Sequence, residues 1–262
     1  MTTKNLKKRE TSGKFLNNRI AFNKKFQKFD FSKWQYLNYK KIIQKEFKNK
    51  KNVKILDVGC GNGLQVSHFI KIIKNPEIYC LDYSLKSLKK IKSNYKRKSI
   101  LTFKIDIDNL NDFINKKKLN KHFDIVHSSY ASYYAKNQLY LLKTMKKSLK
   151  KNGIFLISAP SNPHEMVRYV NKYSPIKKKI LRTLSYYNRV LIPFLKSINN
   201  KIYTIKKINH INFATPLEFI SFWRNTTYYN NKHENEILKN LEKRKNLKFK
   251  KISTITFALN LK

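Results

Sequence analysis

Val53-Lys54-Ile55-Leu56-Asp57-Val58-Gly59-Cys60-Gly61-Asn62-Gly63 is the most informative stretch of this chain, because an apolar run leads there into three of only five glycines. Residues 64–73 follow directly and have the spacing of an amphipathic helix. Glycine lets the backbone turn tightly and lets a ligand approach the main chain closely. A strand, a glycine-rich turn and a helix in this order predict a ligand-binding turn at the start of a βαβ unit.

The same alternation continues beyond this stretch. Short apolar runs recur at residues 78–82, 100–105, 123–127 and 153–158. Segments with helical periodicity separate them, for example residues 85–95 and 138–149. Strands that alternate with helices of this length predict an α/β fold with a mostly parallel sheet and helices on both faces.

Aspartates end three of the predicted strands, although acidic residues are scarce in this chain. Asp57 lies near the end of the first strand, Asp82 ends the second and Asp106 ends the third. Asp82 follows the glycines by roughly 20 residues, where an open α/β sheet places a carboxylate for ribose hydroxyls. Ligands of such sheets bind beyond the carboxyl ends of the strands, which is where these three residues are expected.

The order of these motifs resembles that of class I, Rossmann-like S-adenosylmethionine-dependent methyltransferases, of the small-molecule type. The resemblance covers about residues 30–160 and lies in residues 53–63, 78–84, 103–107, 123–129 and 149–155. The glycines read G-x-G-x-G and not G-x-G-x-x-G, which favours a methyl donor over a nicotinamide dinucleotide. The resemblance implies S-adenosylmethionine as cofactor and these binding residues: Asp57, Gly59, Cys60, Gly61, Gly63, Asp82, Tyr83, Asp106, Ile107 and Ser128.

The chemistry that the resemblance implies is an in-line attack of an acceptor on the activated methyl group, which the enzyme assists mainly by alignment. An oxygen acceptor must lose a proton, so a general base is useful. His127, at the end of the fourth predicted strand, and His164, after the fifth, are the candidates. The two cysteines, Cys60 and Cys80, give neither a disulfide framework nor metal-ligand spacing, so no metal is predicted.

The segment after the fourth strand bears on the acceptor. Adenine and glutamine N-methyltransferases of this class usually carry an Asn/Asp-Pro-Pro-aromatic motif there, whereas this chain reads His127-Ser128-Ser129-Tyr130. The first hypothesis is therefore a small-molecule acceptor with an oxygen or carbon nucleophile. A second hypothesis is an RNA-modifying methyltransferase that uses its basic surface to bind phosphates. The third is a non-catalytic binding or assembly protein of the same fold.

The segments on either side of this core are predicted as follows. Residues 1–14 form a disordered basic tail, and residues 15–48 form a helical cap with a break near residues 30–32, where Ser32 is the expected N-cap. The cofactor-binding core spans 49–160, and a helical cap or acceptor region spans 161–245. Within it, helices are expected at 216–225, with Thr215 as N-cap, and at 234–245. Residues 246–262 are expected to supply a final strand that joins the core sheet.

The charge of the chain is strongly positive. It has 58 Lys and Arg against 15 Asp and Glu, a formal net charge of +43. Such an excess favours polyanions, including nucleic acid, anionic membrane surfaces and acidic substrates, although A/T-rich coding also explains many of these lysines. Residues 177–195 form a basic amphipathic stretch that suits peripheral contact with an anionic membrane.

No run of residues approaches the length of a transmembrane span, and the start does not have the pattern of a secretory signal. With only two cysteines, a cytoplasmic location is expected. The oligomeric state is not predicted.

Overall fold

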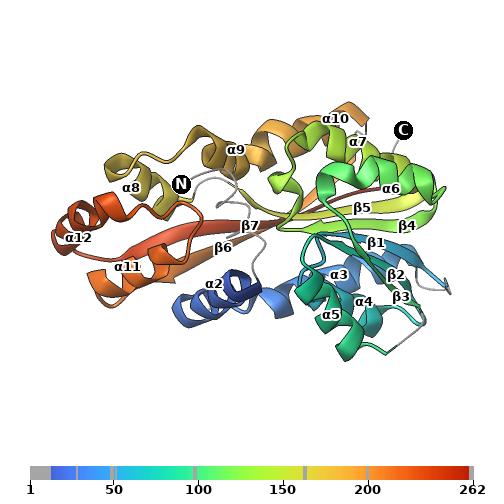
Figure 1. Cartoon of the computed structure of the whole chain (residues 1–262), viewed down its shortest axis with the longest axis horizontal. Helices are drawn as coiled ribbons and strands as arrows, with labels where there is room; N and C mark the ends of the chain where they lie inside the picture. The colour runs from blue at the N-terminus through green and yellow to red at the C-terminus, as the bar shows by residue number, and fades with distance from the viewer. Residues whose placement is uncertain are drawn as a thin grey trace. The chain divides into compact units, whose positions relative to one another are not determined.

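The computed structural model describes residues 13–27, 29–47, 50, 52–96, 99–161, 164–198 and 201–259 (Figure 1). Residues 1–12, most of the predicted basic tail, lie outside this description, and the first helix already begins at Gly13. The helices are α2 (Gly13–Phe26), α3 (Phe31–Phe47), α4 (Leu64–Ile72), α5 (Leu85–Asn94), α6 (Leu110–Lys116), α7 (Gln138–Ser148), α8 (Glu165–Tyr173), α9 (Lys178–Tyr186), α10 (Ile192–Ile198), α11 (Pro216–Arg224) and α12 (Glu234–Glu242). The strands are β1 (Lys54–Val58), β2 (Glu77–Asp82), β3 (Ile100–Lys104), β4 (Phe123–Ser129), β5 (Leu149–Ser161), β6 (Ile202–Asn212) and β7 (Lys248–Leu259).

The strands form one sheet of seven strands in the order β3-β2-β1-β4-β5-β7-β6. The pairs β3–β2, β2–β1, β1–β4 and β4–β5 are parallel, which confirms the predicted α/β class. The order reverses direction between β1 and β4, and such a switch point is where open α/β sheets bind ligands. β7 lies between β5 and β6 in this sheet.

The chain divides into two compact units. The first comprises residues 1–30, 160–185 and 206–253, and the second comprises 31–159, 186–205 and 254–262. The second unit holds β1–β4 and most of β5, with helices α3, α4 and α5 on one face of the sheet and α6, α7 and α10 on the other (Figure 1). Helix α3 thus belongs to the same unit as the core strands, whereas the sequence placed it in a cap.

Two apolar clusters of the second unit lie on the two faces of its sheet. Strand residues alternate between them: Leu56 and Val126 belong to one cluster, and Ile55 and Ile125 belong to the other. Because successive side chains of a strand point to opposite faces, this alternation fixes the register of the central strands. The third cluster belongs to the first unit and contains the fully buried Trp223 of α11.

Helix boundaries follow the capping signals in part. Thr215 is the N-cap of α11, as predicted, since its side chain accepts a hydrogen bond from the Glu218 N–H and Pro216 occupies the first turn. Ser32 is not an N-cap, because α3 begins one residue earlier and the Ser32 hydroxyl lies 3.2 Å from Nε2 of His68. None of the helices in the described part of the chain is long and apolar enough to cross a membrane.

Strand β6 corrects the sequence prediction, which placed residues 202–212 in a helical region. Isoleucines recur there at every third position, Ile202, Ile205, Ile208 and Ile211, which is close to helical spacing. In the structure only Ile211 of these four is fully buried, and Ile208 is exposed. β6 is the last strand in the sheet order, and lysines are characteristic of such edges, so Lys206 and Lys207 belong to an edge strand and not to a helix.

Candidate functional site

The glycine-rich turn joins β1 to α4. Gly59, Gly61 and Gly63 all have positive φ angles of 75°, 52° and 80°. The backbone N–H groups of Gly59 and Cys60 both donate to the carbonyl of Leu81 in β2, at 2.8 and 3.0 Å. These bonds tie the turn to the neighbouring strand and set its path beyond the end of β1.

Two of the three glycines are required by packing within the protein. A Cβ atom on Gly59 would lie 2.2 Å from the Cβ of Ala131, and one on Gly63 would lie 2.8 Å from Cγ1 of Ile91. Both residues also occupy the left-handed region that side chains disfavour. The glycine triplet is therefore explained by the tight turn itself, and evidence for a ligand must come from the polar groups around it.

Asp82 ends β2 and braces this turn. One carboxylate oxygen accepts the Gly61 N–H at 2.8 Å, and the other accepts the Ser84 N–H at 2.8 Å. Burial raises the pKa of the Asp82 carboxyl above its ordinary value, while these two backbone donors oppose the shift. Each carboxylate oxygen can accept more than one hydrogen bond, so Asp82 retains capacity for hydroxyl donors.

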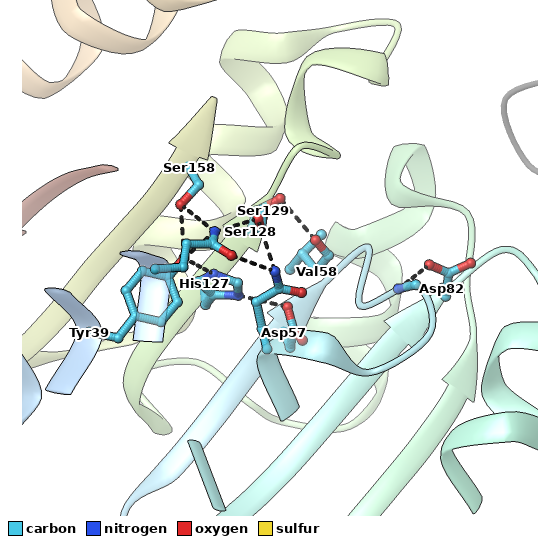
Figure 2. Close-up of polar contacts among 11 residues, drawn as sticks. Tyr39, Asp57, Val58, Asp82, His127, Ser128, Ser129 and Ser158 are labelled. Carbon is cyan, nitrogen blue, oxygen red and sulfur yellow. Dashed lines mark hydrogen bonds and ion pairs between the residues drawn. The ribbon is translucent and has the colours of Figure 1, made fainter. Parts of the chain in front are cut away.

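A buried series of hydrogen-bonded polar side chains runs from Asp57 to Tyr39 (Figure 2). Asp57 of β1 pairs in register with His127 of β4, so both side chains point to the same face of the sheet. Nδ1 of His127 lies 2.7 Å from Oδ1 of Asp57, and Nε2 lies 2.8 Å from the hydroxyl of Tyr39 in α3. All three side chains are almost fully buried. Figure 2 shows Asp82 apart from this group, beside the glycine turn.

A shell of amides and hydroxyls surrounds the Tyr39 hydroxyl. It lies 2.8 Å from Oγ of Ser158 in β5, and Nε2 of Gln35 donates to it at 3.1 Å. Gln35 Nε2 also lies 2.9 Å from Oγ of Ser129, and Nε2 of Gln65 in α4 donates to the side-chain oxygen Oε1 of Gln35 at 3.0 Å. The ends of β4 and β5 are thereby tied to helices α3 and α4, all within the second unit.

One atom of this group points to a ligand. Oδ2 of Asp57 is buried and has no hydrogen-bond partner among the described residues. Leaving one oxygen of a buried carboxylate without a partner is unfavourable unless a donor or a cation reaches it. The residues therefore fit a ligand that carries a positive charge close to the end of β1.

The remaining predicted residues lie at the same edge of the sheet, with different exposure. Tyr83 follows Asp82 and is 46% exposed. Asp106 caps the short helical turn Ile107–Asn109 by accepting the Asp108 N–H, and Asp106 and Ile107 are both half-buried. Ser128 is fully buried and donates to the carbonyl of Val58 at 2.9 Å, so it braces the end of β1 from within.

The side chain of Cys60 is also buried. Burial is the largest cause that raises the pKa of the Cys60 thiol well above its ordinary value, and the neighbouring Cys80 adds to the increase. The contribution of Cys60 to the turn therefore comes from its backbone N–H.

The two histidines predicted as bases lie in different surroundings. The His127 side chain is 0% exposed and both of its ring nitrogens have protein partners. His164 belongs to the other unit, where burial and the nearby Lys251 lower the pKa of its imidazole to about 3. The role of general base stays a prediction for both residues, and neither arrangement favours it.

Sequence reasoning missed the residues that hold His127. Gln35, Tyr39 and Ile43 lie four residues apart in sequence and share one face of α3, and all three are buried. Leu37, an apolar residue of the same helix, is exposed. The available signal was a polar residue, Gln35, at the spacing of an otherwise apolar helix face.

The fold and the polar groups at its carboxyl edge define an α/β protein with a parallel sheet whose switch point lies between β1 and β4, where open sheets of this kind bind ligands. A family model described as a methyltransferase domain matches residues 49–243, most of the 262-residue chain. The chain belongs to this family and is an S-adenosylmethionine-dependent methyltransferase. A search of curated proteins found no match.

Solved structures share the fold at low sequence identity. The YcgJ protein of Bacillus subtilis is 14% identical, with a TM-score of 0.60 over 86% of this chain and 99% of that one. The CurJ carbon methyltransferase is 12% identical, with a TM-score of 0.56 over 87% of this chain and 54% of that one. The plantazolicin methyltransferase BpumL, solved with S-adenosylhomocysteine, is 16% identical, with a TM-score of 0.51 over 97% and 90%.

Proposed function

We propose that this methyltransferase acts on the oxygen or carbon atom of a small molecule, and that this acceptor is acidic. The observation that carries the proposal is the end of β4. His127 and Ser128 are fully buried there and hold Asp57 and Val58 of the neighbouring strand. No Asn/Asp-Pro-Pro-aromatic motif, which would position an exocyclic amine, occupies this place.

The groups at the carboxyl edge of the sheet support the following donor site. S-adenosylmethionine supplies a methyl group activated by a sulfonium. Asp82 would accept the ribose hydroxyls, Tyr83 and Ile107 would contact the adenine ring, and Asp106 would accept the adenine amino group. Asp57 would accept the ammonium of the methionine part through Oδ2, and the turn at residues 59–63 would bring the backbone against the ligand. These roles align the donor, and alignment is the main contribution of the protein to this reaction.

The surroundings of the two histidines support an acidic acceptor. An oxygen nucleophile must lose its proton before or during attack. His127 is engaged at both ring nitrogens, and the low pKa of His164 makes it a weak base. A phenol, an enol or a carboxylic acid ionises without a strong base. The excess of basic residues, 58 against 15 acidic ones, attracts the resulting anion.

Similar folds are compatible with this acceptor class. CurJ is described as a carbon methyltransferase, and BpumL has been solved with a monoazolic desmethyl plantazolicin analogue. These descriptions belong to those proteins, and they indicate that the fold accommodates carbon nucleophiles and small organic acceptors. The cytoplasmic location stays a prediction.

The experiment is an acceptor screen with methyl-labelled S-adenosylmethionine. Phenols and carboxylic acids are tested against matched neutral alcohols and esters, amines, and total RNA. We expect label in an acidic small molecule, with stoichiometric formation of S-adenosylhomocysteine. Label confined to amines would overturn the proposal. Label found only in RNA, and lost steeply as salt rises, would favour the RNA-modifying hypothesis in its place.

A further inference from the structure

We propose that Tyr39 and His127 are positioning residues for the methyl donor, which act by holding Asp57 with one oxygen directed at the donor's ammonium group. The inference deepens the proposed donor site and rests on it. It assigns a role in donor binding to helix α3, which precedes the glycine-rich turn and supplies Tyr39.

Asp57 sets which groups donate and which accept in the series of hydrogen bonds from Asp57 through His127 to Tyr39. An ionised carboxylate only accepts hydrogen bonds, so Nδ1 of His127 carries a proton and donates it to Oδ1 of Asp57 at 2.7 Å. Nε2, on the opposite side of the ring, meets the Tyr39 hydroxyl at 2.8 Å. Contacts at both nitrogens fix the rotation of the imidazole ring, as they do for buried histidines that orient a charged partner.

The ring is also held by packing. Phe69 of α4 stands edge-on to His127, with ring centroids 5.2 Å apart, and stacks on Tyr39 at 6.0 Å. The Tyr39 hydroxyl is in turn fixed by Ser158 and Gln35. Burial raises the pKa of Tyr39 far above its ordinary value, so this hydroxyl stays uncharged at neutral pH.

The consequence lies at Asp57. With Oδ1 held by His127, the carboxylate cannot rotate without breaking a buried bond, and Oδ2 keeps its direction although it has no partner among the described residues. A group held in place before binding loses little freedom when the ligand arrives, and this favours affinity. Tyr39 thus affects the donor through two intervening side chains, His127 and Asp57 (Figure 2).

The first test removes only the distal hydroxyl. Tyr39→Phe keeps the ring, and Tyr187→Phe is the matched control, because Tyr187 is a buried tyrosine of the same unit whose hydroxyl bonds to Thr204. Calorimetry with S-adenosylmethionine and S-adenosylhomocysteine measures the affinity, and thermal unfolding checks the fold. We expect Tyr39→Phe to weaken both ligands about tenfold, as for one lost hydrogen bond, because both carry the ammonium. We expect Tyr187→Phe to leave the affinity for both ligands unchanged.

The second test compares two replacements of the histidine. The amide nitrogen of asparagine can take the place of Nδ1 and donate to Asp57, whereas that of glutamine lies closer to the place of Nε2. Glutamine fills more of the buried volume, so packing alone predicts that His127→Gln binds the donor better. The proposal predicts the reverse order, with His127→Asn the tighter binder. The ¹⁵N signal of His127, assigned by its loss in these variants, should show a protonated Nδ1 and should move at Nε2 in Tyr39→Phe.

The outcomes separate the two levels of the argument. If the unsubstituted protein fails to bind S-adenosylhomocysteine, the donor site itself is wrong. If it binds, but Tyr39→Phe binds equally well or His127→Gln binds better than His127→Asn, only the positioning inference is overturned.

Discussion

Replacing Gly59 by alanine tests how tightly the glycine-rich turn is built. The new Cβ would lie 2.2 Å from the Cβ of Ala131, and the φ angle of 75° stays in the left-handed region. The left-handed conformation costs an L-residue about 1–2 kcal/mol. Overpacking of a filled site costs about 1–3 kcal/mol more. Gly59→Ala should therefore lower the free energy of unfolding by about 2–5 kcal/mol, measured by urea denaturation of the purified protein.

A second substitution separates these two contributions. Ala131→Gly removes the methyl group that the new Cβ meets and leaves the φ angle of residue 59 unchanged. Ala131 has a φ of −127°, so glycine there costs only about 0.5–1 kcal/mol through backbone freedom. In a double-mutant cycle we expect a coupling energy of about 1–3 kcal/mol between the two substitutions, which is the overpacking that Ala131→Gly relieves in the Gly59→Ala background. Additive effects of the two changes, with no coupling energy, would contradict the close approach of residues 59 and 131.

Three further predictions concern other parts of the molecule. Asp124 is 1% exposed and accepts hydrogen bonds from Lys50, Lys150 and a backbone N–H. Burial acts to raise the pKa of the Asp124 carboxyl, but these three donors outweigh the effect of burial and lower the pKa below its ordinary value. The contribution of Asp124 to stability is therefore present above the ordinary carboxyl pKa and is lost as pH falls through its lowered pKa. Asp124→Asn should lower the free energy of unfolding by about 1–3 kcal/mol at pH 7 and by less at pH 3, measured by urea denaturation at both pH values. Thr215→Ala removes the N-cap of α11 and should cost about 1 kcal/mol, whereas an unchanged unfolding midpoint would contradict the capping bond. Cys60 should resist iodoacetamide at pH 8 in the folded protein, because burial raises the pKa of its thiol, and rapid labelling would contradict that burial.

The central part of the fold could be predicted because its signals are local. Apolar runs of strand length and glycines in a turn appear in the sequence itself. β1 and β2 begin and end within one residue of the expected positions, whereas β3 ends at Lys104, two residues before Asp106. β5 is longer than expected, because it spans Leu149–Ser161 whereas the apolar run covers only residues 153–158. β6 was missed because its isoleucines recur every third residue, and only the neighbouring strand shows which of them are buried.

Some residues of the candidate site could likewise be predicted from the sequence, and others could not. The residues of the turn and the strand ends could be predicted, since an open parallel sheet collects the carboxyl ends of its strands at one edge. The contact between Asp57 and His127 depends on the register of β1 against β4, which lie 70 positions apart in sequence at this pair. Tyr39 and Gln35 depend on how α3 packs against that sheet, which no local pattern specifies.

The proposed donor site is tested by calorimetric binding of S-adenosylmethionine to the unsubstituted protein and to Asp82→Asn, with thermal unfolding as a check of the fold. Asp82 braces the glycine-rich turn and is the proposed partner of the ribose hydroxyls. We expect saturable binding with one donor per chain, and binding at least tenfold weaker in Asp82→Asn, because this substitution removes charge-assisted hydrogen bonds. Equal affinity of the two folded proteins, or no binding to either, would contradict this donor site.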